Sequence, residues 1–195
     1  DSGNSRGVVF ADMDADGDLD LFVANMTLSP ESSQPLRYYR QRNDGTFQNA
    51  TDEAFRGKKF KLPYTHISIA DIDGDGDLDA FVAGYGNTVT NPPNHIVEAD
   101  NGQPNLLLIN DGNGVFTNEA TERGFVHNDW TYAAGFADVD QDNDQDIYLA
   151  NDWGINRFHI NDGKGFFTES AAAYNLAHPG AGMGVLWTDM DGNGD

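Results

Sequence analysis

The sequence lacks cysteine and is poor in positive charge. The absence of cysteine excludes disulfide bonds and thiolate metal sites. Only 11 lysines and arginines stand against 32 acidic residues, which gives a formal net charge of −21. Nucleic-acid partners need positive side chains for their phosphates, so this balance argues against them. No apolar run approaches the roughly 20 residues of a membrane-spanning helix.

The acidic residues are concentrated in four short segments with aspartate at alternate positions. More than half of the 32 acidic residues lie in Asp loop 1 (residues 12–20), Asp loop 2 (71–79), Asp loop 3 (138–146) and Asp loop 4 (189–195). Clustered carboxylates repel one another unless a cation lies among them. The distribution therefore predicts metal sites rather than an acidic tail.

A second block, Asn-Asp-Gly followed by phenylalanine, alternates with the Asp loops. It begins at Asn43, Asn110 and Asn161, and the next Asp loop starts 28 residues later in all three cases. The spacing from an Asp loop to the next block varies instead, at 31, 39 and 23 residues. Constant spacing predicts a structural unit, and variable spacing predicts surface loops that tolerate insertion. The insertions are roughly residues 25–35 and 84–105.

Short strand-like runs flank both blocks. In each repeat one run precedes the Asp loop (7–11, 67–70, 134–137) and a second follows it (21–24, 80–83, 147–150). A third run precedes the Asn-Asp-Gly block (36–39, 106–109, 157–160), and a fourth follows that block around Phe47, Phe116 and Phe167. Asn-Asp-Gly between two strands indicates a hairpin, because the turn needs positive φ. Four antiparallel strands per repeat are the unit of a β-propeller. The only helical signal is a single turn at residues 171–173.

We therefore predict an all-β fold, a β-propeller of four-stranded antiparallel blades, in one partial domain over residues 1–195. The repeats cover approximately 7–65, 66–132, 133–183 and an incomplete 184–195. Propellers close with about four to eight blades, and open strand edges invite pairing. We expect either further chain after Asp195 or a partner subunit that closes the propeller.

The Asp loops predict calcium sites. Aspartates at positions 1, 3, 5 and 9 direct oxygens toward one cation, and position 7 adds its backbone carbonyl. Calcium accepts about six to eight oxygens with loose geometry, so it fits better than magnesium. Position 6 must turn sharply, which Gly17 and Gly76 allow and Asn143 tolerates. The candidate ligands for three sites and a possible fourth are Asp12, Asp14, Asp16, Asp18, Asp20, Asp71, Asp73, Asp75, Asp77, Asp79, Asp138, Asp140, Asp142, Asp144, Asp146, Asp189, Asp191 and Asn193.

An EF-hand loop opens with the same pattern but needs a glutamate at position 12 and helices on both sides. Position 12 is Val23, Val82 or Leu149 here, and the flanks are strand-like. Ordinary acidic turns without metal are the other alternative, and three near-identical copies argue against them.

Residues 7–25 resemble the FG-GAP/VCBS repeat of integrin α-chain propellers, and residues 110–121 resemble the cartilage acidic protein branch of that family. The resemblance covers essentially the whole chain. It implies a seven-bladed propeller with calcium in the loop between the first two strands of each motif-bearing blade. The departures are Asn143 at the glycine position, a first Asn-Asp-Gly block without a second glycine, and the truncated fourth motif.

Alternating strand direction places the Asp loops and Asn-Asp-Gly turns on one face and the insertions on the other. In relatives of this type the face opposite the calcium loops carries ligands, as the resemblance implies. We therefore predict a calcium-stabilised extracellular or cell-surface adhesion module for a protein or glycan partner. The five histidines share no spacing typical of a catalytic site, and we expect no enzymatic activity from this chain itself.

Two other functions stay open. The chain could be the propeller of a carbohydrate-active enzyme such as a polysaccharide lyase, or a structural repeat segment of a larger surface or filament protein. The basic-aromatic group that a lyase would use is Lys58, Lys59, Lys61, Tyr64 and His66. Trp130 and Trp187 border first strands and are expected in blade packing, while Trp153 in a loop fits either packing or ligand binding.

Overall fold

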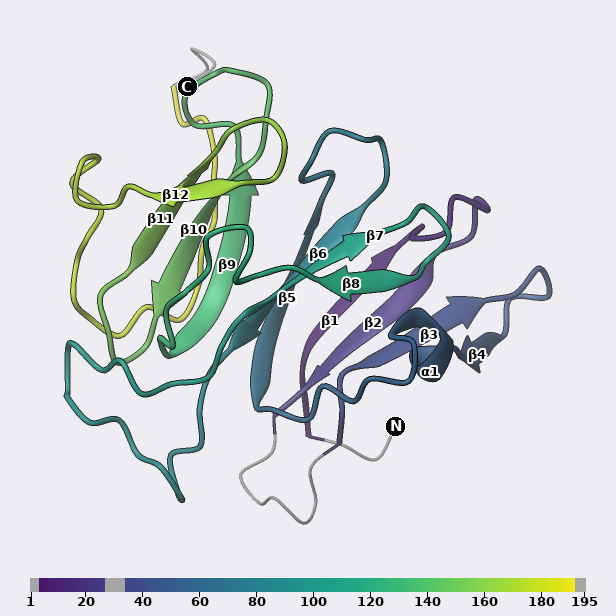
Figure 1. Ribbon diagram of the computed structural model, residues 1–195, viewed down its shortest axis with the longest axis horizontal. Coiled ribbons are helices and arrows are strands. Elements are labelled where there is room, and N and C mark those ends of the chain that lie inside the picture. Colours follow the sequence, from purple (N-terminus) through teal and green to yellow (C-terminus); the bar gives the residue numbers. More distant parts are fainter. Residues whose placement is uncertain (1–3, 27–33, 192–195) are drawn as a thin grey trace.

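The computed structural model describes residues 4–26 and 34–191, and it contains three four-stranded sheets (Figure 1). Within each sheet the strands follow chain order and neighbours are antiparallel. We call the sheets blades 1 to 3. Blade 1 consists of β1 (Ser5–Ala11), β2 (Asp20–Asn25), β3 (Arg37–Gln41) and β4 (Phe47–Asn49). Blade 2 consists of β5 (Tyr64–Ala70), β6 (Asp79–Gly84), β7 (Leu106–Asn110) and β8 (Phe116–Asn118). Blade 3 consists of β9 (Thr131–Ala137), β10 (Asp146–Asn151), β11 (Arg157–Asn161) and β12 (Phe167–Glu169). The predicted all-β fold with four-stranded blades is confirmed.

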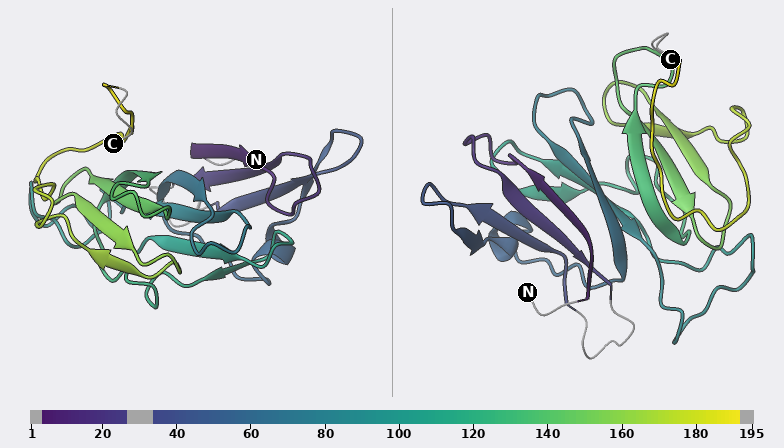
Figure 2. Two further views of the ribbon diagram at one scale, coloured as in Figure 1. Left: turned by 90° about the horizontal axis from the view of Figure 1, so that it is seen from above. Right: turned by 180° about the vertical axis from the view of Figure 1, so that it is seen from behind.

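The first strands of the blades lie next to one another. β1 lies beside β5, and β5 beside β9, so the three blades fan out from one side (Figures 1 and 2). Ser68 donates a hydrogen bond from its hydroxyl to the carbonyl of Ala134 at 2.8 Å, and Thr65 does the same to the carbonyl of Thr131 at 3.0 Å. Trp187 continues the pattern after blade 3, because its indole N–H donates to the carbonyl of Gly135 at 3.1 Å. Its ring contacts that of Tyr148 in blade 3 at a centroid distance of 6.2 Å, while the side chain stays 37% exposed.

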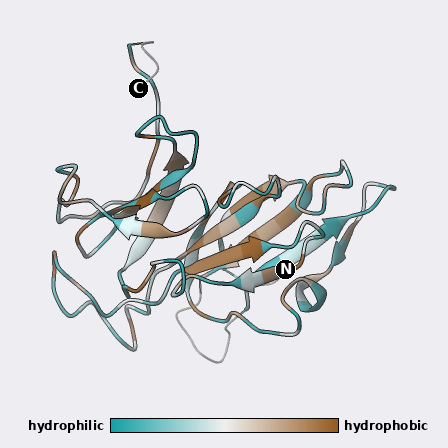
Figure 3. Cartoon of the chain, turned by 45° about the horizontal axis from the view of Figure 1, so that its top comes forward, coloured by the Kyte–Doolittle hydropathy of each residue, from teal (hydrophilic) through white to brown (hydrophobic). Residues whose placement is uncertain are grey.

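Apolar side chains fill the space between the blades. Phe22 and Tyr38 of blade 1 pack with Val82, Leu108 and Phe116 of blade 2. On the other side of blade 2, a second cluster joins it to blade 3. Every residue of β6 and β7 is buried because blade 2 is covered on both faces. This explains the continuous apolar runs there, which stand out among more hydrophilic loops in Figure 3.

Two details differ from the prediction. The helical turn expected at 171–173 is a hydrogen-bonded turn, whereas a short helix, α1 (Thr51–Ala54), follows β4. Thr51 ties α1 to β3, because its hydroxyl accepts from the N–H of Tyr38 at 3.0 Å and donates to the carbonyl of Tyr38 at 3.2 Å. This contact is between residues 13 apart and leaves no local signal in the sequence.

The alignment of the first Asn-Asp-Gly block was wrong by two residues. Gln41 pairs with Phe47 in blade 1, as Asn110 pairs with Phe116 and Asn161 with Phe167. Gln41, and not Asn43, therefore corresponds to Asn110. The equal spacing of 28 residues arose because the additional residues around α1 compensate for this shift.

One histidine is fully enclosed between blades 2 and 3. His159 is 1% exposed, lies against the ring of Phe125 at a centroid distance of 4.6 Å, and has no hydrogen-bond partner at either ring nitrogen. The charged or titratable groups near it are His127, Arg157 and Asp129. Burial, together with His127 and Arg157, lowers the pKa of His159 from 6.5 to about 3.

This histidine predicts acid lability. The native state keeps His159 neutral, whereas the unfolded chain binds a proton below pH 6.5. Its contribution to stability is therefore complete above pH 6.5 and is lost as the pH falls toward 3, by at most about 1.4 kcal/mol per pH unit. We expect His159→Phe to flatten the decline in the free energy of unfolding between pH 7 and 5, as measured by urea denaturation. His178→Phe, at an exposed position, serves as the control. If the free energy of unfolding of His159→Phe depends on pH in the same way as that of the native chain, the prediction is wrong.

Candidate metal centres

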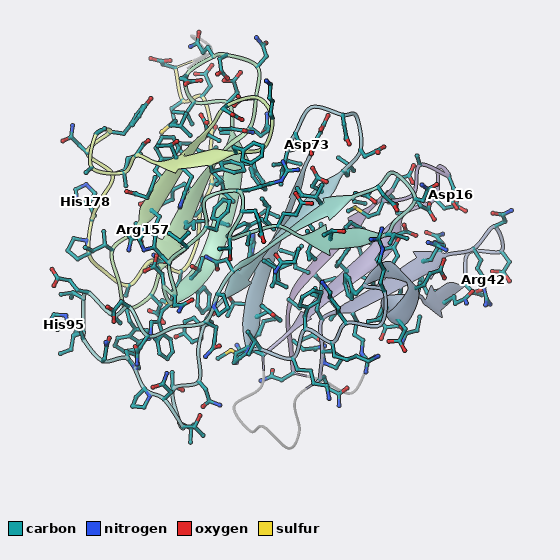
Figure 4. All side chains as sticks on the ribbon, in the orientation of Figure 1. Asp16, Arg42, Asp73, His95, Arg157 and His178 are labelled. Carbon is teal, nitrogen blue, oxygen red and sulfur yellow. The ribbon has the colours of Figure 1, made fainter. Side chains whose placement is uncertain are left out.

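The three described Asp loops lie at one end of the blades. The antiparallel strand order places them beside the β3–β4, β7–β8 and β11–β12 turns, as predicted. Figure 4 shows Asp16, Asp73 and Arg42 toward this end, and His95 and Arg157 toward the other. Of Asp loop 4, Asp189 and Asp191 are described, while Asn193 lies outside the described residues.

Each loop is shaped by its own first aspartate. In Asp loop 1 the two oxygens of Asp12 accept the N–H groups of Asp16 at 3.1 Å and Gly17 at 3.0 Å. The position-1 aspartates of the other two loops accept two backbone N–H groups in the same way. The position-5 carboxylate then accepts the N–H of position 7, at 2.9, 3.0 and 3.2 Å in the three loops. The loop conformation therefore follows from hydrogen bonds within the motif.

The backbone turns at two positions of each loop. Position 6 has positive φ, as predicted, at 91° for Gly17, 95° for Gly76 and 73° for Asn143. Position 4 also has positive φ, which the sequence did not indicate because Ala15 and Gln141 occupy it in two loops. An alanine or glutamine in the left-handed region costs about 1 kcal/mol, which the hydrogen bonds to position 1 must offset.

The position-9 aspartates are buried connectors. Each is 1% exposed. In Asp loop 2 the oxygens of Asp79 accept the N–H groups of Ile72 at 3.0 Å and Asn110 at 2.8 Å. Asp146 repeats both bonds in blade 3, and Asp20 accepts from the N–H of Gln41 and the hydroxyl of Tyr38. Burial raises the pKa of Asp79 to about 7. These residues thus tie each Asp loop to the end of the third strand of its blade, independently of any metal ion.

The structure brings three aspartates together in each described loop. Their oxygens lie within 4.8 Å of one another in Asp12, Asp14 and Asp16; in Asp71, Asp73 and Asp79; and in Asp138, Asp140 and Asp142. These groups could hold a metal ion. The remaining candidates, Asp18, Asp20, Asp75, Asp77, Asp144 and Asp146, flank these groups in the same loops.

Several oxygens in these loops have no partner. Oδ1 of Asp14, Asp73 and Asp144 is buried and accepts no hydrogen bond. Burial and the neighbouring carboxylates raise the pKa of all three groups, that of Asp144 to about 6. A buried, unpaired carboxylate oxygen is costly, and a hard cation would satisfy it. The donors are all oxygens, which suits calcium better than zinc or copper. The residues present therefore fit a hard divalent cation.

Two asparagines of the Asn-Asp-Gly turns connect consecutive blades, a role that the turn pattern did not indicate. The side-chain amide of Asn110 donates to the carbonyl of Met13 in Asp loop 1 at 2.8 Å. That of Asn161 donates to the carbonyl of Ile72 in Asp loop 2 at 2.9 Å. The turn of one blade thereby holds the Asp loop of the blade before it.

The opposite end of the blades carries a hydrogen-bonded aromatic cluster. The hydroxyl of Tyr85 donates to Asp152 at 2.5 Å and accepts the indole N–H of Trp153 at 3.1 Å. Trp130 is fully buried, as expected for blade packing, and donates to Asn101 at 3.0 Å. Trp153 is half-buried and packs against this cluster.

The basic-aromatic group proposed for a lyase does not form one exposed site. Tyr64 is fully buried and His66 is half-buried on β5, while Lys58 and Lys59 are exposed. Lys59 is paired with Asp52. The described residues also include no helix of sufficient length and apolarity to cross a membrane.

The comparison with known proteins agrees with this repeat architecture. A family model for the FG-GAP-like repeat matches residues 12–82 and 138–195. The first match contains Asp loops 1 and 2, and the second contains Asp loops 3 and 4. No curated protein matches the chain.

The two kinds of aspartate predict different mutant behaviour. In excess chelator we expect Asp79→Ala to lower the free energy of unfolding by about 2–3 kcal/mol, because it leaves two buried N–H groups unpaired. The exposed Asp75 accepts only the N–H of Asp77, so Asp75→Ala should cost less than about 1 kcal/mol under the same conditions. Urea denaturation measures both values, and equal losses would refute the connector role of Asp79.

Proposed function

Because the chain belongs to the FG-GAP-like repeat family, we propose that it is a calcium-stabilised binding module of a secreted or cell-surface protein. Each described Asp loop would hold one Ca²⁺, and Asp loop 4 would hold a fourth. The observation that carries this proposal is the set of buried, unpartnered oxygens on Asp14, Asp73 and Asp144. A protein or glycan ligand would bind at the opposite end of the blades.

Calcium would supply the positive charge that the loops lack. Each loop places five carboxylates within nine residues, and the position-1 and position-5 groups are already oriented by backbone N–H groups. Extracellular modules of this kind bind calcium with dissociation constants of about 10⁻⁴–10⁻³ M. Free calcium at 100 times the dissociation constant would stabilise the fold by about 2.7 kcal/mol per site.

The insertion between β6 and β7 supports a binding role for the opposite end. Asn101 holds it together, since its amide donates to the carbonyl of Pro92 at 2.9 Å and its oxygen accepts from Asn94 at 3.1 Å. This ordered loop exposes Val89 and Ile96, which are 69% and 76% accessible. Large apolar side chains on a hydrogen-bonded loop suit contact with a partner.

The alternatives have less support. A lyase would need the lysines, Tyr64 and His66 in one accessible group, and the buried Tyr64 does not favour it. A structural repeat segment would use the same blades without a ligand. We propose that the chain has no catalytic role of its own.

Chelation tests the calcium proposal. We expect excess EDTA to lower the melting temperature by many degrees in differential scanning calorimetry, and added calcium to restore it more effectively than added magnesium. Calcium titration by calorimetry should saturate at three or four sites. The quadruple variant Asp12→Asn, Asp71→Asn, Asp138→Asn and Asp189→Asn, which changes position 1 of all four Asp loops, should melt at the same temperature with and without EDTA. A native chain whose melting is indifferent to EDTA would end the proposal.

A further inference from the structure

Two arginines reach the Asp loops from different places in the chain. Arg40 lies on β3, and its Nε is 2.8 Å from Oδ2 of Asp14. Arg123 follows β8, and its Nη2 is 3.1 Å from Oδ2 of Asp73. Both aspartates occupy position 3 of their loops. The same position is thus paired with a guanidinium group in blades 1 and 2, although the two arginines do not correspond in the repeats.

Each guanidinium also binds the following blade. Arg40 donates to the carbonyl of Asn113 at 3.2 Å, and Arg123 donates to the carbonyl of Lys164 at 2.8 Å. These carbonyls occupy the same position in the β7–β8 and β11–β12 turns. A glycine follows each of them, and a Cβ atom at Gly165 would lie 2.2 Å from Nη1 of Arg123. The turns therefore have glycine where the guanidinium group approaches.

Asp loop 3 has a different charge environment. Its position-3 residue, Asp140, is exposed and forms no ion pair with a lysine or arginine in the part of the chain that the structure describes. By strand register, Ile160 corresponds to Arg40. Counting from the last strand, Tyr174 corresponds to Arg123. Neither side chain can supply a positive charge.

We propose that Arg40 and Arg123 are built-in counter-ions that hold Asp loops 1 and 2 in place without a divalent cation, whereas Asp loop 3 depends on the cation. The inference rests on the proposed function, because the cation in question is the proposed calcium. Arg40 and Arg123 are positioning residues, since they act through Asp14 and Asp73.

Two physical arguments support this assignment. An arginine–carboxylate bond in a partly buried setting is stronger than an exposed pair, and the side chain of Arg123 is only 10% exposed. Of the two oxygens on Asp14 and on Asp73, the guanidinium contacts Oδ2, and Oδ1 stays without a partner. Arg40 contacts Asp14 as an ion pair without a hydrogen bond from Nε. Arg40 is also paired with Glu53 and Arg123 with Glu119, so each guanidinium shares its charge with a second carboxylate. The arginine therefore offsets part of the repulsion in the loop and leaves one oxygen for the cation.

Hydrogen exchange of the full chain, followed by mass spectrometry, tests the three loops separately. With calcium, we expect all three loops to be protected. With EDTA, the amides of residues 138–146 should exchange at least about 10-fold faster, while those of 12–20 and 71–79 keep most of their protection. Equal acceleration of amide exchange in all three loops in EDTA would overturn the inference. If calcium protects no loop, the proposed function fails. The arginine variants then still test the counter-ions, because Asn110 and Asn161 also hold Asp loops 1 and 2 and are unchanged in those variants.

Variants separate the counter-ion role from a merely structural one. Arg40→Met should expose residues 12–20 in EDTA and regain protection with calcium, and Arg40→Lys should retain part of the protection in EDTA. Arg123→Met should do the same for residues 71–79. Arg157→Met is the matched control, because Arg157 is also paired with an aspartate, Asp129, but lies away from the Asp loops.

The reverse change gives an independent measurement. Ile160→Arg places a guanidinium in blade 3 at the position that Arg40 has in blade 1. We expect it to slow the exchange of residues 138–146 in EDTA and to leave their protection in calcium unchanged. Two results together would overturn the counter-ion role: residues 12–20 stay protected in EDTA in the Arg40→Met variant, and Ile160→Arg does not slow exchange in Asp loop 3.

Discussion

Repulsion among the carboxylates of the Asp loops is the constraint on which this end of the molecule depends. Each loop carries five aspartates in nine residues, and the fold offsets their charge in several ways. Backbone N–H groups bind positions 1, 5 and 9, and in two loops a guanidinium binds position 3. The oxygens that remain buried and unpaired are costly, and a cation would satisfy them.

The same groups also hold the blades together. The turn of blade 2 reaches Asp loop 1 through Asn110 and accepts from Arg40, and the turn of blade 3 repeats this with Asn161 and Arg123. The interface between two blades therefore includes an apolar layer and a polar contact at the loop end. A change in the charge of one loop acts on the packing of the next blade, because they share these bonds.

The fold was largely predictable because its signals are local. Alternating apolar runs, turn residues and the repeated Asp loops lie within a few residues of the structures they specify. The error at Asn43 has a physical cause: in blade 1 the residue that binds the position-9 aspartate through its backbone is Gln41, and a backbone N–H has no sequence signature.

The roles within the site were less predictable because they depend on distant contacts. Arg123 and Asp73 are 50 residues apart, and Asn110 and Met13 are 97 apart. Strands of six or seven residues separate the Asp loops from the opposite end by about 20 Å, so a cation in an Asp loop would not touch a ligand at that end. Any influence of the proposed cation on that end would pass through blade packing. Blades 2 and 3 have their own contact at that end, the bond between Tyr85 and Asp152. Because this bond lies far from the Asp loops, the proposed cation would govern the loop end of that interface more strongly than the opposite end.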